Sequence, residues 1–262
     1  MPRQADTQPP SCASIGRVNV LALYDIHGNI DALNAVLADP RAADPDVVLV
    51  GGDVVPGPFA RATLDRLNAL EDVRWIRGNG EREVAEAIDG PEPDPGDAAR
   101  VTAKLTLDEL GPETARPLGD LPLTLELDGV LYCHATPRAD DEMVTRISAP
   151  ERYATVLQDV TAKTVVAGHT HQQHDVMVGA IRFLNAGSVG MPYEGDGAAR
   201  WLWVEDGVPE ARATSYDAAG AGTRMLASGW PDERSVGAAL IEPVDPLVVT
   251  AIFEEVAAGQ GI

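Results

Sequence analysis

The sequence predicts an α/β fold with two β-sheets, the first rich in parallel strands and the second rich in hairpins. Short apolar runs alternate with helical segments over the first third of the chain, which is typical of parallel strands covered by helices. Further along, turn signals such as Asp128-Gly129 separate pairs of apolar segments, which is typical of antiparallel hairpins. A chain of 262 residues with 45% hydrophobic residues suffices for one such domain with a full core.

The parallel half begins with two nearly continuous apolar runs, at residues 18–24 and 47–50, which predict buried strands. Between them, residues 30–38 carry apolar side chains at helical spacing. Residues 60–70 repeat this spacing, and residues 73–76 predict a third strand. This order of strands and helices indicates a parallel sheet with helices packed on it.

The second half is expected to be built mainly from hairpins. The elements expected there are, in order, strands at 123–127 and 130–133, a helix at 150–160, a strand at 164–167, and hairpins at 175–184 and 200–215. Trp201 and Trp203 lie two residues apart on one of these strands and therefore face the same side. They predict either core packing or the interface of a homo-oligomer.

Three segments do not follow the strand pattern. Residues 81–118 predict a helical insertion near the functional site, with a lid as one reading of it. The polar, Pro-rich residues 1–16 predict a disordered tail, which leaves 17–262 as a single domain. Within it, 217–262 is expected to be a C-terminal extension that is irregular over 217–243 and ends in a helix at about 245–258.

Charge and hydropathy exclude several classes of function. The 41 acidic and 20 basic residues give a net charge of −21, which repels phosphate backbones and argues against binding of long nucleic acid. No segment approaches the ~18 apolar residues of a membrane span, and the N-terminal residues lack the apolar stretch of a secretory signal. We therefore expect a cytoplasmic protein without a membrane partner.

Five short motifs carry residues that bind metals, and each follows a predicted strand. As candidate metal ligands they supply two Asp, one Asn (Asn79) and four of the five histidines of the chain. The motifs are Asp25-Ile26-His27-Gly28-Asn29, Gly51-Gly52-Asp53, Gly78-Asn79, Cys133-His134 and Gly168-His169-Thr170-His171. Each motif alone has an ordinary reading as a turn or a core residue, but their joint occurrence in this order favours a shared metal site.

The placement of these motifs predicts that their side chains converge. Asp25 and His27 are two residues apart, as are His169 and His171, so strand alternation would send each pair to one face. In open α/β sheets, ligands bind outside the carboxyl ends of the strands, where all seven donors are expected. Carboxylate, amide and imidazole donors of this kind suit a pair of divalent cations in phosphoryl chemistry.

With these motifs, residues 18–205 resemble the calcineurin-like metallophosphoesterases, in the small bacterial and archaeal phosphodiesterase-like branch. The resemblance also rests on residues 53–58 (DVVPGP), 134–137 (HATP) and 185–190 (NAGSVG). It implies a four-layer αββα sandwich. It also implies two divalent metal ions, with Mn²⁺ expected first and Fe, Zn²⁺ or Ni²⁺ as alternatives.

The resemblance also implies a role for each motif residue. One metal would be held by Asp25, His27 and His171. The second would be held by Asn79, His134 and His169, and Asp53 would bridge the two. A hydroxide that bridges the metals would then attack phosphorus in line.

One departure from the family pattern bears on the substrate. Many phosphatases of the family have a histidine directly after the Gly-Asn pair that protonates the leaving group, but here that position is Gly80. Glu81 is a candidate for this acid, although its residue type and position favour a carboxylate at a helix N-terminus instead. Asn29 and Arg82 are candidates for binding the substrate phosphate, with turn capping and an ordinary surface position as their alternatives.

The sequence therefore favours a two-metal phosphodiesterase acting on a small or nucleotide-like phosphorylated substrate. A missing leaving-group acid would hinder monoesters of poorly activated alcohols most, which tilts the expectation toward diesters. The alternatives are a phosphomonoesterase or protein phosphatase, and a non-catalytic protein-interaction scaffold on the same fold.

Overall fold

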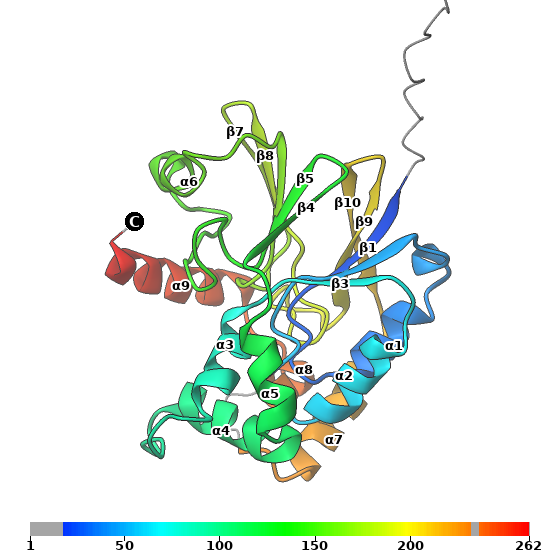
Figure 1. Ribbon diagram of the computed structural model, residues 1–262, viewed down its shortest axis with the longest axis vertical. Coiled ribbons are helices and arrows are strands. Elements are labelled where there is room, and N and C mark those ends of the chain that lie inside the picture. The colour runs from blue at the N-terminus through cyan, green and yellow to red at the C-terminus, as the bar shows by residue number, and fades with distance from the viewer. Residues whose placement is uncertain (1–17, 232–235, 262) are drawn as a thin grey trace, which may run out of the picture.

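The computed structural model describes residues 18–231 and 236–261 of the chain. Two five-stranded mixed sheets stack face to face, with helices on their outer faces (Figure 1). The expected two-sheet α/β sandwich is thus confirmed. The tail expected over residues 1–16 lies outside the described residues.

The first sheet joins the parallel half of the chain to the last hairpin. Its strands are, in spatial order, β10 (Val208–Thr214), β9 (Ala199–Glu205), β1 (Asn19–Leu23), β2 (Val47–Val50) and β3 (Val73–Trp75). β1, β2 and β3 are parallel, and β9 runs antiparallel to β1. The connections are the helices α1 (Ile30–Leu37) and α2 (Ala60–Asn68) and the short 3₁₀ turn η1 (Pro40–Ala42).

The second sheet has the order β4 (Thr124–Leu127), β5 (Val130–Cys133), β6 (Thr164–Ala167), β8 (Ile181–Asn185) and β7 (His174–Val178). β5, β6 and β8 are parallel, whereas β4 and β7 pair antiparallel at the two edges. The helix expected at 150–160 is α6 (Pro150–Val156). The predicted turn at Asp128-Gly129 joins β4 to β5, and the hairpins expected at 175–184 and 200–215 form as β7–β8 and β9–β10.

Three apolar clusters hold these layers together. Val20, Leu49 and Tyr132 belong to the cluster between the two sheets. Leu33 and Val36 of α1 pack with α2 side chains on the outer face of the first sheet, and α6 packs on the outer face of the second. The chain thus forms four layers, and the carboxyl ends of both sets of parallel strands lie at one edge.

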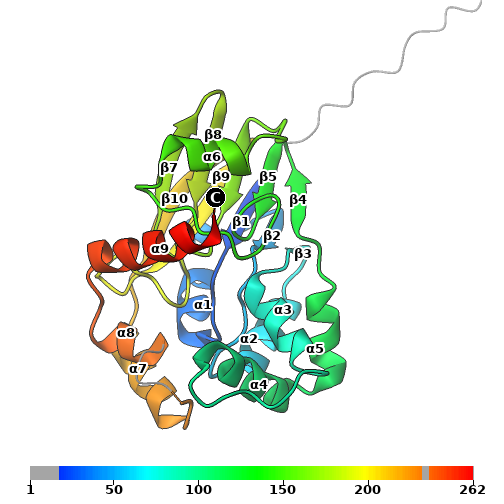
Figure 2. The same cartoon turned by 90° about the vertical axis from the view of Figure 1, so that its left-hand side faces the viewer.

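The expected insertion is helical and begins at this edge. It consists of α3 (Asn79–Glu86), α4 (Ala98–Leu110) and α5 (Pro112–Gly119), which lie below the sheets in Figures 1 and 2. Gly111 ends α4 with a φ of 75°, and α5 starts directly after it.

The prediction of an irregular segment over 217–243 is wrong. The structure has α7 (Ala218–Ala227) and α8 (Val236–Ile241) there, followed by the expected terminal helix α9 (Pro246–Gln260). A Cβ on Gly222 would lie only 2.5 Å from the carbonyl oxygen of Gly237, so these glycines let two helices cross closely instead of breaking them.

Trp201 and Trp203 both pack on the apolar cluster at the outer face of the first sheet, Trp201 fully buried and Trp203 partly. The indole of Trp201 donates to the Thr214 hydroxyl at 2.9 Å. Trp201 therefore serves the core and offers no surface to a partner. Within the described part of the chain, no helix is long and apolar enough to cross a membrane.

Candidate metal centre

The strand-end motifs converge at the carboxyl edge of the two sheets. The metal-binding atoms of Asp25, His27 and His171 all lie within 4.8 Å of one another. Those of Asp53, His134 and His169 form a second such group. We refer to these groups as the first and second triads. They bring together residues that the sequence predicts to share a metal.

Left-handed backbone turns, not strand alternation, aim these side chains. β1 ends at Leu23, and Asp25 and His27 have φ values of 53° and 47°. His169 and His171 follow β6 in the same way, with φ values of 67° and 55°. The predicted convergence holds, but its expected cause was wrong. Each non-glycine residue in this conformation costs ~1–2 kcal/mol, so the loops store strain.

Three motif glycines allow the loops to approach the ligands closely. A Cβ on Gly78 would lie 2.2 Å from Oδ1 of Asp53, and one on Gly168 would lie 2.5 Å from Oδ2 of Asp25. A Cβ on Gly52 would lie 2.7 Å from Nδ1 of His134. These positions therefore exclude any larger residue, which explains the Gly-Gly-Asp, Gly-Asn and Gly-His patterns.

Four atoms of the predicted ligands are buried and have no hydrogen-bond partner. Seven buried side-chain atoms lack a partner among the described residues, and four of them are Asp25 Oδ1, Asn79 Oδ1, His134 Nε2 and His169 Nε2. An unpaired buried polar atom costs about 1–3 kcal/mol. Divalent cations bound by these oxygens and nitrogens would satisfy all four, so the residues present fit a metal pair.

Backbone carbonyls orient three of the imidazole rings. Nδ1 of His134 lies 2.9 Å from the Gly51 oxygen, and Nδ1 of His171 lies 2.8 Å from the Met191 oxygen. Nδ1 of His27 contacts the Pro56 oxygen at 3.3 Å. Because a carbonyl only accepts, each Nδ1 carries a proton, which leaves Nε2 to face the centre. In a neutral ring this is the atom with the lone pair, as in metal-binding histidines.

Asp53 belongs to the second triad and also faces the first. Its Oδ2 is 3.5 Å from Nε2 of His134 and 3.8 Å from Nε2 of His27. Its Oδ1 accepts the Gly80 N–H at 2.8 Å, which fixes the carboxylate plane. A single oxygen thus faces both groups, as a bridging ligand requires.

The pKa values of the buried His134 and His169 are shifted in opposite directions by their surroundings. Burial lowers the pKa of His134, but the Asp53 and Asp25 carboxylates outweigh it and raise this pKa to about 10. Burial and the neighbouring His134 lower the pKa of His169 to about 4. The site therefore attracts positive charge strongly on the side of His134.

Glu81 supports the loops from behind. Its two carboxylate oxygens accept four backbone N–H groups, those of Asp53, Val54, Val55 and Gly78, at 2.8–3.3 Å. Burial and the charge of Asp53 raise its pKa to about 7. The carboxylate thereby ties the second-strand loop to the start of α3.

Asn29 and Arg82 connect parts of the fold. The Asn29 side chain caps α1 by accepting the Ala32 N–H at 3.0 Å, and it donates to the Gly190 oxygen at 2.8 Å. The Arg82 guanidinium lies 3.1 Å from both oxygens of Asp140. The phosphate contacts expected of these residues stay predictions, as does the acid role of Glu81.

Sequence reasoning assigned no role to Asn185 and Ser188, although their motif was noticed. The Asn185 amide donates to the Gly168 oxygen and to the Thr170 hydroxyl. The Ser188 hydroxyl donates to the backbone carbonyl oxygen of Asp25 at 2.6 Å and accepts the Met191 N–H at 2.7 Å. Both side chains thus hold the loops that carry Asp25 and His169. The presence of polar residues in a segment made otherwise of small residues could have indicated this role from the sequence.

The C-terminal helix also reaches this centre. The Tyr193 ring stacks on His171 with centroids 4.9 Å apart, and Phe253 of α9 packs against Tyr193 at 5.9 Å. Gln172 donates to the Pro246 oxygen at 2.8 Å and accepts the Thr250 hydroxyl at 2.7 Å. α9 therefore supports the loop that carries His169 and His171.

Residues 18–205 match the calcineurin-like phosphoesterase superfamily domain. The chain belongs to this superfamily. The matched segment includes both triads and Asn79, and ends at the end of β9. No curated protein matches the chain.

Two solved structures share the fold. A metallophosphoesterase from Sphaerobacter thermophilus superposes with a TM-score of 0.68 at 22% identity, covering 87% of this chain and 99% of that one. A hypothetical protein from Pyrococcus horikoshii OT3 superposes with a TM-score of 0.72 at 21% identity, with the same coverage of both chains. Both similarities extend beyond the matched domain.

Proposed function

We propose that this member of the superfamily is a two-metal phosphodiesterase that hydrolyses a small or nucleotide-like diester. The observation that supports it most is the set of four unpaired atoms on predicted ligands, one on Asp25 of the first triad and three on Asn79, His134 and His169, which would hold the second ion. Two bound cations would supply a hydroxide at neutral pH and neutralise charge on the phosphoryl oxygens. The first triad would hold one ion, and Asn79, His134 and His169 would hold the second.

The preference for a diester rests on Gly80. A Cβ at this position would lie 2.0 Å from the Val55 oxygen, so the backbone leaves no room for a histidine side chain. The neighbouring Glu81 already accepts four N–H groups. A diester with a good leaving group needs no protonation by the protein, whereas a monoester of a poorly activated alcohol does.

Mn²⁺ is the ion we propose first, because the ligand set mixes oxygen and imidazole donors and contains no thiolate. Two carboxylates and one amide oxygen accompany four imidazoles, a mixture that suits Mn²⁺ and Fe²⁺ and also accepts Zn²⁺. The buried Cys133 precedes His134, but its Sγ lies 3.7 Å from the Val166 oxygen.

The described residues support a single functional unit that includes the C-terminal extension. The Glu254 carboxylate of α9 accepts the hydroxyls of Thr145 and Ser148 and pairs with Arg152 at 3.1 Å. Gln260 contacts the backbone of Asp141 and Met143. α9 is thus fastened to the loop after β5 as well as to the metal-binding loop.

The test compares hydrolysis of bis-p-nitrophenyl phosphate with that of p-nitrophenyl phosphate, using metal-stripped protein with Mn²⁺ added back. We expect diester turnover that requires the metal and exceeds monoester turnover, and that is lost in Asp53→Asn. Faster monoester turnover would reject the diester preference. No turnover of either ester, with no metal bound, would leave the non-catalytic scaffold.

A further inference from the structure

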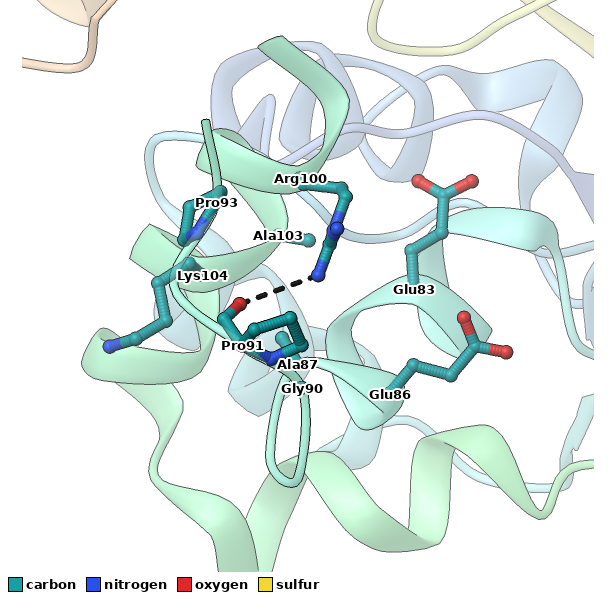
Figure 3. A pocket seen from close by; sticks show the side chains of 9 residues that line it. All are labelled: Glu83, Glu86, Ala87, Gly90, Pro91, Pro93, Arg100, Ala103 and Lys104. Carbon is teal, nitrogen blue, oxygen red and sulfur yellow. Dashed lines mark hydrogen bonds between the residues drawn. The ribbon is translucent and has the colours of Figure 1, made fainter. Parts of the chain in front are cut away.

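A cavity of about 230 Å³ lies between α3 and α4. Glu83 and Glu86 of α3 line one side of it, and Arg100 and Lys104 of α4 line the other (Figure 3). Pro91, in the loop that joins the two helices, closes one end. We call this space the α3–α4 cavity.

One side chain separates this cavity from the predicted ligand Asn79. Oε1 of Glu83 accepts the Asn79 side-chain N–H at 3.2 Å, while Oδ1 of Asn79 is one of the unpaired atoms at the metal centre. Along α3, Glu86 lies seven residues beyond Asn79, which is about 10 Å at 1.5 Å per residue. A group joined to a phosphate at the metals could extend this far.

The two cations on α4 are unusual in so acidic a chain, which has 20 basic and 41 acidic residues. The Arg100 side chain extends from α4 across the cavity to the Pro91 oxygen, with its Nη2 at 3.3 Å (Figure 3). That oxygen is a neutral acceptor, so the flat guanidinium is not neutralised by it. A planar cation of this kind stacks on nucleobases.

The remaining walls restrict the ligand further. Glu86 pairs with Arg82 at 3.6 Å, and Lys104 pairs with Asp108 on its own helix. The Arg100 guanidinium, in contrast, contacts the neutral Pro91 oxygen. A simple anion would meet the carboxylates of Glu83 and Glu86, and a saturated apolar ligand would offer the Arg100 guanidinium no π face. Ala87 and Ala103 add apolar surface. A nucleobase satisfies all three features, because its face suits Arg100 and the alanines, and N–H groups on its edge donate to carboxylates.

We propose that the α3–α4 cavity binds the nucleobase of the substrate. This rests on the proposed hydrolysis of a nucleotide-like diester, and it identifies which part of the substrate is recognised away from the metals. Arg100 would stack on the base, and Glu86 would accept its amino group.

The test uses adenosine, which has no phosphate and therefore does not depend on the metal centre. Isothermal titration of adenosine into metal-stripped protein is compared for the wild type, Arg100→Ala and Arg74→Ala. Arg74 is an exposed arginine on β3 that pairs with Asp72 at 2.8 Å, so its variant controls for loss of one positive charge. Thermal unfolding of each variant confirms that it is folded.

We expect saturable binding to the wild type, about tenfold weaker binding to Arg100→Ala, and unchanged binding to Arg74→Ala. A Glu86→Gln variant should also bind adenosine more weakly. Absence of saturable binding, or equal binding by the wild type and Arg100→Ala, would overturn the proposal.

The two proposals fail separately. If wild-type protein hydrolyses the test diester but does not bind adenosine, only the nucleobase site is wrong. If adenosine binds in a manner that depends on Arg100 but no ester is hydrolysed, the cavity assignment stands and the phosphodiesterase proposal is wrong.

Discussion

The two edges of the sandwich use the same backbone conformation differently. At the hairpin edge, Asp128 and Asp206 have φ values of 50° and 53°, and each precedes a glycine in a two-residue turn. There the conformation matches the twist of the paired strands, so it serves the fold. At the carboxyl edge, His27, His169 and His171 adopt it outside any hairpin. That strain is retained where side chains converge, which indicates a site.

Two largely buried histidines show the same contrast. His174 lies on an edge strand, with Nε2 3.0 Å from the Tyr153 hydroxyl and its ring stacked on Phe183. Burial lowers its pKa to about 4. His134 faces two carboxylates and has an unpaired Nε2. Burial alone therefore does not indicate a ligand, whereas an unpaired nitrogen beside carboxylates makes His134 a candidate for one.

We expect the largest loss of activity from replacing Asp53 at the carboxyl edge, compared with replacing Asp128 at the hairpin edge. Asp53→Asn keeps the shape of the side chain and an oxygen for the Gly80 N–H, but removes the bridging charge. We expect at least about a 10³-fold loss of metal-dependent diester hydrolysis, or ~4 kcal/mol of transition-state stabilisation. Asp128→Asn is the matched control, since asparagine tolerates the left-handed conformation. Equal activity of the two variants in steady-state assays would remove the distinction between the edges.

The next largest contrast is expected between a glycine at each edge, Gly78 and Gly129, when each is replaced by alanine. Gly78→Ala would place a Cβ 2.2 Å from Asp53 Oδ1, so we expect about 10²-fold weaker Mn²⁺ binding by calorimetry. Gly129→Ala meets nothing within 4 Å and has a φ of 75°, so it should cost ~1 kcal/mol of stability and leave metal binding unchanged. Wild-type affinity in Gly78→Ala would show that close approach of the loop is unimportant.

The lowered pKa of His174 should make the free energy of unfolding depend on pH. Its folded pKa of about 4 lies below the unfolded value of about 6.5, so its stabilising effect is complete above pH 6.5 and is lost as the pH falls toward 4. At pH 5 the loss should be ~2 kcal/mol. His174→Phe should therefore lose less stability than the wild type between pH 7 and pH 5. Urea unfolding of metal-stripped protein measures this, and parallel losses would contradict it.

The smallest expected effect concerns α9. Phe253→Ala removes the ring behind Tyr193, which stacks on His171, so Mn²⁺ affinity should fall by about threefold to tenfold. Ile252→Ala, at a neighbouring position that is 51% exposed, is the control and should bind normally. Unchanged affinity in Phe253→Ala, measured by titration of the metal-stripped protein, would show that α9 does not support the centre.

The sequence predicted the strands and the convergence of the ligands well, because apolar runs and turn pairs are local signals. Val47–Val50, Val130–Cys133 and Thr164–Ala167 have the predicted bounds. The left-handed turns at Asp25 and His27 escaped prediction, because tertiary contacts impose a conformation that histidine rarely adopts.

Predictions from composition failed at the C-terminal extension. Gly222 and Gly237 indicated irregular structure, yet they allow two helices to cross. Glu81 was predicted at a helix N-terminus, and its location in α3 agrees with that. Its contacts with the Asp53–Val55 backbone depend on residues 26 to 28 positions away, which no local pattern records.

The most direct test of the metal centre is to measure how many metal ions each chain binds, and where. Metal-stripped protein is dialysed against Mn²⁺, its metal content is determined by mass spectrometry, and anomalous diffraction locates the ions. The structure predicts two ions per chain, one at Asp25, His27 and His171 and the other at Asn79, His134 and His169. Protein that binds no ion at these residues would contradict the assignment of the strand-end loops as a metal centre.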